Sequence, residues 1–149
     1  MEINRITPDE HIFSQRLAHI ANPPKSLCYM GKLPETNAPV VSIVGSRKPS
    51  AYGKEVTERL ATDLAKAGCV IVSGLALGVD CIAQKAAIEA GGTVVAVVPN
   101  ELPDISPRTN YQLAMSIIEQ GGAVVSEWMK GDNKIVNRWS FLERNRLAS

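Results

Sequence analysis

The sequence predicts a doubly wound α/β fold, in which a mainly parallel sheet carries helices on both faces. From Val40 onward, short runs rich in β-branched residues alternate with longer stretches of helical periodicity. The runs are mostly apolar and do not alternate with polar residues, which is typical of strands buried on both faces of a parallel sheet. Their strict alternation with the helical stretches indicates repeated β-α-β units. The predicted strands cover 40–45, 69–74, 93–99 and 123–127, and the predicted helices cover 51–68, 79–92 and 109–122.

Composition places the chain among ordinary globular proteins. Its 149 residues, 45% of them hydrophobic, suffice for one core. A formal net charge of +1 indicates neither a nucleic-acid nor a membrane partner, so any anion site must be local. Three widely spaced cysteines, Cys28, Cys69 and Cys81, are typical of buried thiols in a reducing compartment. Because neither a signal peptide nor an apolar run of roughly 18 residues occurs, we expect a cytoplasmic protein.

The first 39 residues are less regular. Thr7 as N-cap, Pro8 at the first helical position and Glu10 three residues on predict a short helix that covers 7–20. Four prolines then surround the apolar run 27–30, which reads as an arm or a short edge strand. We therefore divide the chain into an N-terminal helix and proline-rich arm, 1–39, and an α/β domain, 40–149.

The helices of the α/β part have their own signals. Val56, Leu60 and Leu64 recur at helical spacing in the first helix. Gly91 closes the second helix. Thr109 and Gln112 have the spacing of a capping box at the start of the third.

Ligands of such sheets bind beyond the carboxyl ends of the strands. The first two segments there, "GSRKPS" and "SGLALGVD", place glycine at the strand exit shortly before a helix, where backbone N–H groups can bind a phosphate. Glycines that only shape a turn are an equal alternative for each loop. Arg47 favours phosphate in the first loop, because its guanidinium can make a bidentate contact. Asp80 favours a structural role in the second, as a carboxylate that fixes the loop through backbone hydrogen bonds.

Other kinds of site find little support. Neither G-x-G-x-x-G nor G-x-x-x-x-G-K-[ST] occurs, so the standard NAD and ATP loops are not indicated. No Ser-His-Asp set, carboxylate pair or metal-ligand cluster indicates hydrolysis, and His11 and His19 have no partners at ligand spacing. We expect a protein that is not an enzyme, with no cofactor and no metal.

Several motifs in fixed order resemble the DNA-processing protein A family, also called DprA or Smf. They are "IVGSR", "YG", "SGLALGVD", "GG-TVVAV", "SPRTN-QL", "SE" and "F-ERNR", and the resemblance extends over 17–149. It implies a Rossmann-like domain that binds single-stranded DNA and helps to load a recombinase onto it, in recombination or natural transformation and competence. It also implies no substrate turnover, and it leaves a homodimer open.

The resemblance assigns a DNA- or phosphate-binding role to residues that would surround one basic pocket. The motif positions matched are Gly45, Ser46, Arg47, Ser73, Gly74, Ala76, Gly78, Asp80, Arg108, Asn110, Phe141, Arg144, Asn145 and Arg146. All of them except Ala76 and Asp80 are our predicted binding residues. Arg47 alone has support from its own local sequence.

The chain also departs from the family pattern. Leu77, Gln84 and Ser106 stand where the family usually has arginine, histidine and tyrosine, which bears on affinity more than on fold. Family members continue beyond "RNRLAS", so we expect 40–149 to be incomplete at its C-terminal end and the sheet to expose an edge after its fourth strand.

Two alternatives of other classes remain. The first is a nucleotide-sensing module, in which the glycine loops and Arg47 would hold a small nucleotide. The second is a phosphoribohydrolase acting on nucleoside monophosphates, but its "PGGxGTxxE" motif is absent and "VPNELPDISP" stands in that region.

Overall fold

The computed structural model describes residues 2–35, 37–134 and 144–148. Within these residues the strands form one six-stranded sheet in the order β1-β2-β6-β5-β4-β3. The strands are β1 (Asn4–Ile6), β2 (Leu27–Gly31), β3 (Val40–Ser42), β4 (Val70–Ser73), β5 (Val94–Val97) and β6 (Ala123–Ser126). The helices are α1 (Ala51–Lys66), α2 (Val79–Glu89) and α3 (Tyr111–Glu119), with 3-10 turns η1 (Pro8–Glu10), η2 (Ser14–His19) and η3 (Arg108–Asn110).

The four strands β3 to β6 run parallel, and β2 and β1 add antiparallel strands beyond β6. The predicted α/β class and the mainly parallel sheet are thus confirmed. β3 is shorter than the predicted strand 40–45, although the Ile43 amide still donates to the Val72 carbonyl over 3.0 Å.

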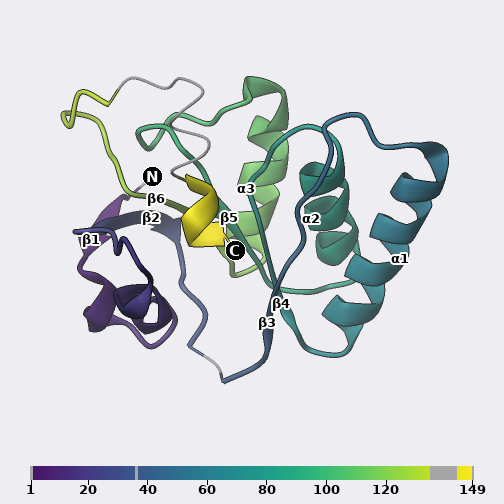
Figure 1. The fold of residues 1–149 in the computed structure, drawn as a ribbon, viewed down its shortest axis with the longest axis horizontal. Coiled ribbons are helices and arrows are strands. Elements are labelled where there is room, and N and C mark those ends of the chain that lie inside the picture. Colours follow the sequence, from purple (N-terminus) through teal and green to yellow (C-terminus); the bar gives the residue numbers. More distant parts are fainter. Residues whose placement is uncertain (1, 36, 135–143, 149) are drawn as a thin grey trace.

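The three α-helices lie on the same face of the sheet. Because the strand order steps in one direction from β3 to β6, right-handed crossovers place every connecting helix on one side. Figure 1 shows α1, α2 and α3 side by side, with the N-terminal segments at the opposite side of the molecule. A doubly wound sheet carries a second layer of helices on its other face, and in this structure that layer consists of η1, η2 and the helical residues 144–148.

Two apolar cores follow from the pleat, which sends successive side chains to opposite faces. One core joins the helices to the first face, and its members include Met30, Ile71, Val94, Ile117 and Val124. The other joins the N-terminal segment and the helical residues 144–148 to the second face, and its members include Leu27, Val72, Val95, Val125 and Leu147. None of the helices in the described ranges is long and apolar enough to cross a membrane.

The N-terminal region differs from its prediction in two ways. The expected helix 7–20 forms two 3-10 turns instead. The Ser14 hydroxyl, at the start of η2, donates to the carbonyls of Pro8 (2.7 Å) and His11 (3.2 Å), and such local bonds compete with α-helix formation. The predicted edge strand 27–30 is an interior strand, because its flanking prolines bound β2 without interrupting it and β1 pairs with its outer side.

Two further predictions are wrong at single elements. The expected exposed edge after the fourth parallel strand does not occur, because β6 pairs with β2. The capping box of Thr109 and Gln112 is absent, since α3 begins at Tyr111 after η3 and has no side-chain cap. Gly91 does follow the end of α2, with φ +80°, and its amide donates to the Ile88 carbonyl over 2.9 Å.

Candidate nucleic-acid interface

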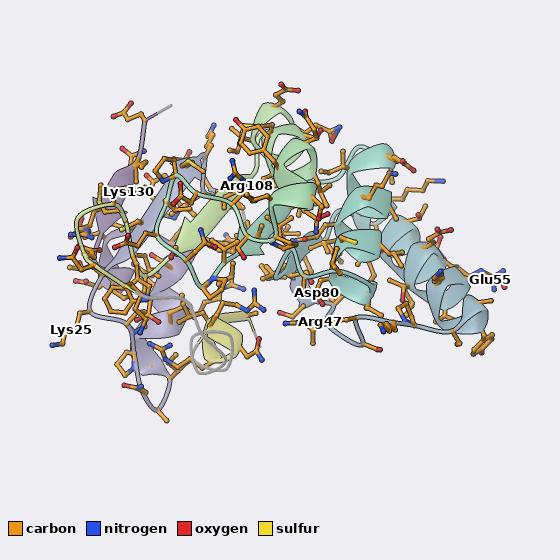
Figure 2. The ribbon with its side chains drawn as sticks, turned by 90° about the horizontal axis from the view of Figure 1, so that it is seen from above. Lys25, Arg47, Glu55, Asp80, Arg108 and Lys130 are labelled. Atoms are coloured by element: carbon orange, nitrogen blue, oxygen red, sulfur yellow. The ribbon has the colours of Figure 1, made fainter. Side chains whose placement is uncertain are left out.

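A cavity of about 350 Å³ lies at the carboxyl ends of the parallel strands, where the sequence predicts a site. The loops after β3 and β4 form it together with the helical residues 144–148. Figure 2 shows Arg47 and Asp80 next to each other at this place. Its lining residues are Val44, Gly45, Arg47, Ala76, Asp80, Arg144, Asn145 and Ala148.

Asp80 holds both strand exits. Its carboxylate accepts hydrogen bonds from the amide of Gly45 (3.3 Å) after β3 and from the amide of Gly74 (3.1 Å) after β4. The side chain lies in the first turn of α2 and is only 4% exposed. The predicted structural role of Asp80 is therefore confirmed, and these two amides are engaged by its carboxylate.

The two glycine loops pack tightly against each other. A Cβ added at Gly78, which has φ +87°, would lie 2.3 Å from the Ser46 carbonyl oxygen and 2.6 Å from the Arg47 backbone. The Val79 amide donates to the same Ser46 carbonyl over 3.0 Å. The Ser46 hydroxyl in turn accepts from the Lys48 amide over 3.0 Å. These contacts fix the backbone from which the exposed side chain of Arg47 extends.

Arg144 reaches the same strand ends from the other side of the cavity. Its Nη1 donates to the carbonyls of Gly74 (2.8 Å) and Val97 (2.7 Å), and its Nε donates to Asn145 Oδ1 (3.1 Å). The residue is 6% exposed. Burial lowers the pKa of the Arg144 guanidinium, the Asp80 carboxylate raises it, and the neighbouring charge of Arg47 lowers it. Arg47 and Arg144 thus place two positive charges close together beside the Asp80 carboxylate.

Three more polar side chains bind the backbone of these loops. The Ser73 hydroxyl is buried and donates to the Ile43 carbonyl. Asn110 Nδ2 donates to the Leu75 carbonyl over 2.6 Å, and the Leu75 amide donates to Gln84 Oε1 over 3.1 Å. Sequence reasoning missed this role of Gln84, although its spacing of four residues from Asp80 places both on one face of α2.

The other predicted binding residues lie elsewhere. Arg108 is exposed on η3, and Figure 2 shows it apart from Arg47 and Asp80. Arg146 faces a second cavity, of about 570 Å³, where it pairs with Glu127 (2.6 Å) and donates to the Asn22 carbonyl (2.8 Å). Phe141 lies outside the described residues. The predicted single pocket therefore includes Gly45, Arg47, Arg144 and Asn145, whereas Arg108 and Arg146 do not line it.

Among the described residues, no three His, Cys, Asp or Glu side chains gather in a way that could hold a metal ion. Of the departures from the family pattern, Leu77 is 49% exposed beside Gly78, and Gln84 is fully buried against Leu75.

Comparison with known proteins identifies close relatives. Residues 4–149 match the model of the family described as DNA recombination-mediator protein A. The chain is 36% identical to Protein Smf of Borreliella burgdorferi over 92% of its own length and 43% of that protein. It is 35% identical to the DNA processing protein DprA of Streptococcus pneumoniae over 89% of its own length and 46% of that protein.

Two solved structures of DNA processing protein A are similar to this chain in fold and sequence. One describes the single-stranded DNA binding mode of DNA processing protein A from Helicobacter pylori. It has a TM-score of 0.81 and 37% identity, over 99% of this chain and 64% of that one. Another, of DprA from Streptococcus pneumoniae, has a TM-score of 0.84 and 31% identity over 99% and 50%.

The chain spans about two fifths of the length of the first curated relatives that it matches, 43% and 38%. The family model nevertheless covers residues 4–149, and both solved structures align with 99% of this chain. The chain therefore belongs to the DNA recombination-mediator protein A family, whose members are named Smf and DprA.

Proposed function

We propose that this chain binds single-stranded DNA through the cavity at the strand ends, and that it does so by binding alone, without turnover of a substrate. The observation that carries the proposal is the pair Arg47 and Arg144 beside Asp80 in this cavity. Two guanidinium groups in one cavity at the ends of parallel strands suit a phosphodiester, although the chain as a whole is near neutral.

Arg47 is the proposed phosphate ligand. Its side chain is exposed, its backbone is fixed by the second glycine loop, and a guanidinium can bind two phosphate oxygens at once. Asn145, exposed at the cavity, and Arg108, exposed after β5, are proposed as further contacts. Phe141 stays a predicted DNA contact, and its aromatic ring could stack on a base.

The relatives support DNA as the ligand. The Helicobacter pylori structure, at 37% identity, concerns single-stranded DNA binding by DNA processing protein A. The family description, recombination mediator, supports a role in which bound DNA is passed to a recombinase. We propose that loading step as the biological purpose, in recombination and natural transformation.

The test measures fluorescence anisotropy of a labelled oligonucleotide, single-stranded against duplex, across a salt series. We expect preferential binding to the single strand, with affinity falling as salt rises because phosphate contacts release counterions. Arg47→Ala should weaken binding at least tenfold and reduce the salt slope by about 0.7, the value for one phosphate contact on a single strand.

Arg59→Ala is the matched control, because it removes an exposed arginine from α1 outside the cavity. It should bind within about twofold of the unmodified chain. Binding of a mononucleotide without binding of DNA would overturn the proposal in favour of a nucleotide-sensing module.

A further inference from the structure

The backbone of Gly74 and Leu75 is bound by side chains at all four of its polar groups. The Gly74 amide and carbonyl are held by Asp80 (3.1 Å) and Arg144 (2.8 Å). The Leu75 amide and carbonyl are held by side chains from α2 (3.1 Å) and η3 (2.6 Å). We call the four side chains the clasp: Asp80, Gln84, Asn110 and Arg144.

The clasp holds a strained loop. Leu75 has φ +59°, a left-handed conformation that residues other than glycine rarely adopt. Its side chain is fully buried, so the loop cannot relax without moving the core. Strained backbone persists where its surroundings over-determine it, and four hydrogen bonds on two residues do so here.

The effect of the clasp reaches Arg47 through direct contacts. The Asp80 carboxylate that holds Gly74 also holds the amide of Gly45. Gly78 packs against the backbone of Ser46 and Arg47. Movement of the second loop would therefore move the loop that presents Arg47.

Arg144 is the clasp member that joins separate parts of the fold. One nitrogen, Nη1, donates to carbonyls at the exits of both β4 (Gly74) and β5 (Val97), and a Cβ at Gly74 would lie 2.4 Å from it. The guanidinium occupies the space that a side chain at position 74 would need. Lysine would keep the charge but lacks the planar fork of donors.

We infer that Arg144 is a positioning residue: its buried guanidinium fixes the Gly74–Gly78 loop, and DNA affinity depends on it through Arg47 and not through contact with DNA. This inference rests on the proposed function, because it concerns the same site.

The experiment compares Arg144→Ala, Arg144→Lys, Arg47→Ala and the double variant Arg47→Ala/Arg144→Ala by anisotropy over a salt series, with binding stoichiometry and thermal melting measured for each. Arg59→Ala is again the matched control, because it removes an equal charge from an exposed side chain on α1, outside the cavity. A last arm adds millimolar guanidinium to Arg144→Ala, against NaCl at equal ionic strength.

Both Arg144 variants should weaken single-strand affinity at least tenfold with stoichiometry unchanged. Because they displace Arg47, they should lower the salt slope by no more than the value of about 0.7 that Arg47→Ala removes. Adding Arg144→Ala to Arg47→Ala should therefore change affinity and slope little further. Guanidinium should restore part of the affinity of Arg144→Ala, and Arg59→Ala should stay within about twofold of the unmodified chain.

Three results would overturn the inference. A further fall in affinity and slope when Arg144→Ala is added to Arg47→Ala would show that Arg144 contacts phosphate itself. A lowered stoichiometry with unchanged affinity would reduce its role to stability, and unchanged binding would remove any role. If the unmodified chain does not bind the single strand, the proposed function itself fails, and the inference with it. If it binds in an Arg47-dependent way but Arg144 has no effect, only the inference fails.

Discussion

Gly78 is the residue at which the two loops of the candidate site meet. Its φ of +87° and ψ of −132° lie close to a region that glycine alone populates readily. A side chain there would collide with backbone atoms of Ser46 and Arg47, which cannot yield as a flexible side chain would. Glycine at this position thus allows the backbone conformation of its own loop and the close packing of the loop after β3 against it.

Gly78→Ala should therefore destabilise the chain far more than a positive φ alone requires. Gly91 offers a matched comparison, because it has φ +80° and nothing within 4 Å of an added Cβ. We expect Gly91→Ala to lower the free energy of unfolding by about 1 kcal/mol, the cost of the left-handed conformation. Gly78→Ala should lower it by about 3 kcal/mol or more, since backbone strain is added.

Urea denaturation followed by circular dichroism measures both variants. Equal losses at the two positions would contradict the close approach of the loops, and Gly78→Ala should also weaken DNA binding whereas Gly91→Ala should not.

At the scale of the element, the parallel strands were predictable and the antiparallel ones were not. The runs that became β4, β5 and β6 are buried at every position and apolar except at their terminal serines, Ser73 and Ser126, because both faces are covered, and this composition shows in the sequence. β1 is only three residues long and polar at Asn4 and Arg5, so no pattern marks it. β2 was recognised as a strand, but its place in the sheet depends on pairing with residues about a hundred positions away.

The candidate site shows the same contrast between residues that local sequence predicts and residues that long-range contacts position. Arg47 and Asp80 could be predicted because each follows a strand exit within a few residues, where local rules apply. Arg144 binds the exits of β4 and β5 because residues 144–148 pack against strand ends that lie far from them in the sequence. The sequence places Arg144 in the right cavity through family resemblance, but its burial is visible only in three dimensions.

The interior position of β2 can be tested through Cys28. This thiol is fully buried, and burial raises its pKa, while the Arg5 guanidinium, whose Nε donates to Sγ over 3.3 Å, lowers it. Because only the thiolate is reactive, Cys28 should resist a thiol reagent at pH 8 until the sheet opens.

A Cys69→Ser/Cys81→Ser variant leaves Cys28 as its single thiol. Its labelling rate should fall at least a hundredfold below that of the urea-unfolded chain and should rise with urea in step with global unfolding. Labelling at low urea, before the unfolding transition, would mean that β2 opens independently as an edge strand does.

At the scale of the whole molecule, the N-terminal arm and the α/β part share one sheet. β2 pairs with β6 along Cys28 to Gly31, and Leu27 and Met30 contribute to opposite cores. The side chains of Leu27 and Met30 are 2% and 1% exposed. The division of the chain at residue 39 stays a prediction, and these contacts indicate that 40–149 depends on the residues before it.

Deletion of residues 2–39 should therefore abolish cooperative unfolding. Each buried Leu or Met side chain contributes about 1.5–3 kcal/mol, and loss of β2 also leaves the backbone groups of β6 unpaired. The stabilisation lost with β2 and its side chains is thus a large part of a total free energy of unfolding of about 5–15 kcal/mol.

Deletion of residues 2–10 is the matched control, because it removes the three-residue edge strand β1 with η1 and keeps β2 in place. Thermal melting by circular dichroism should show a sharp transition at lower temperature for the shorter deletion and none for the longer one. A sharp transition for 40–149 alone would establish it as an independent domain, with 1–39 as an appended arm.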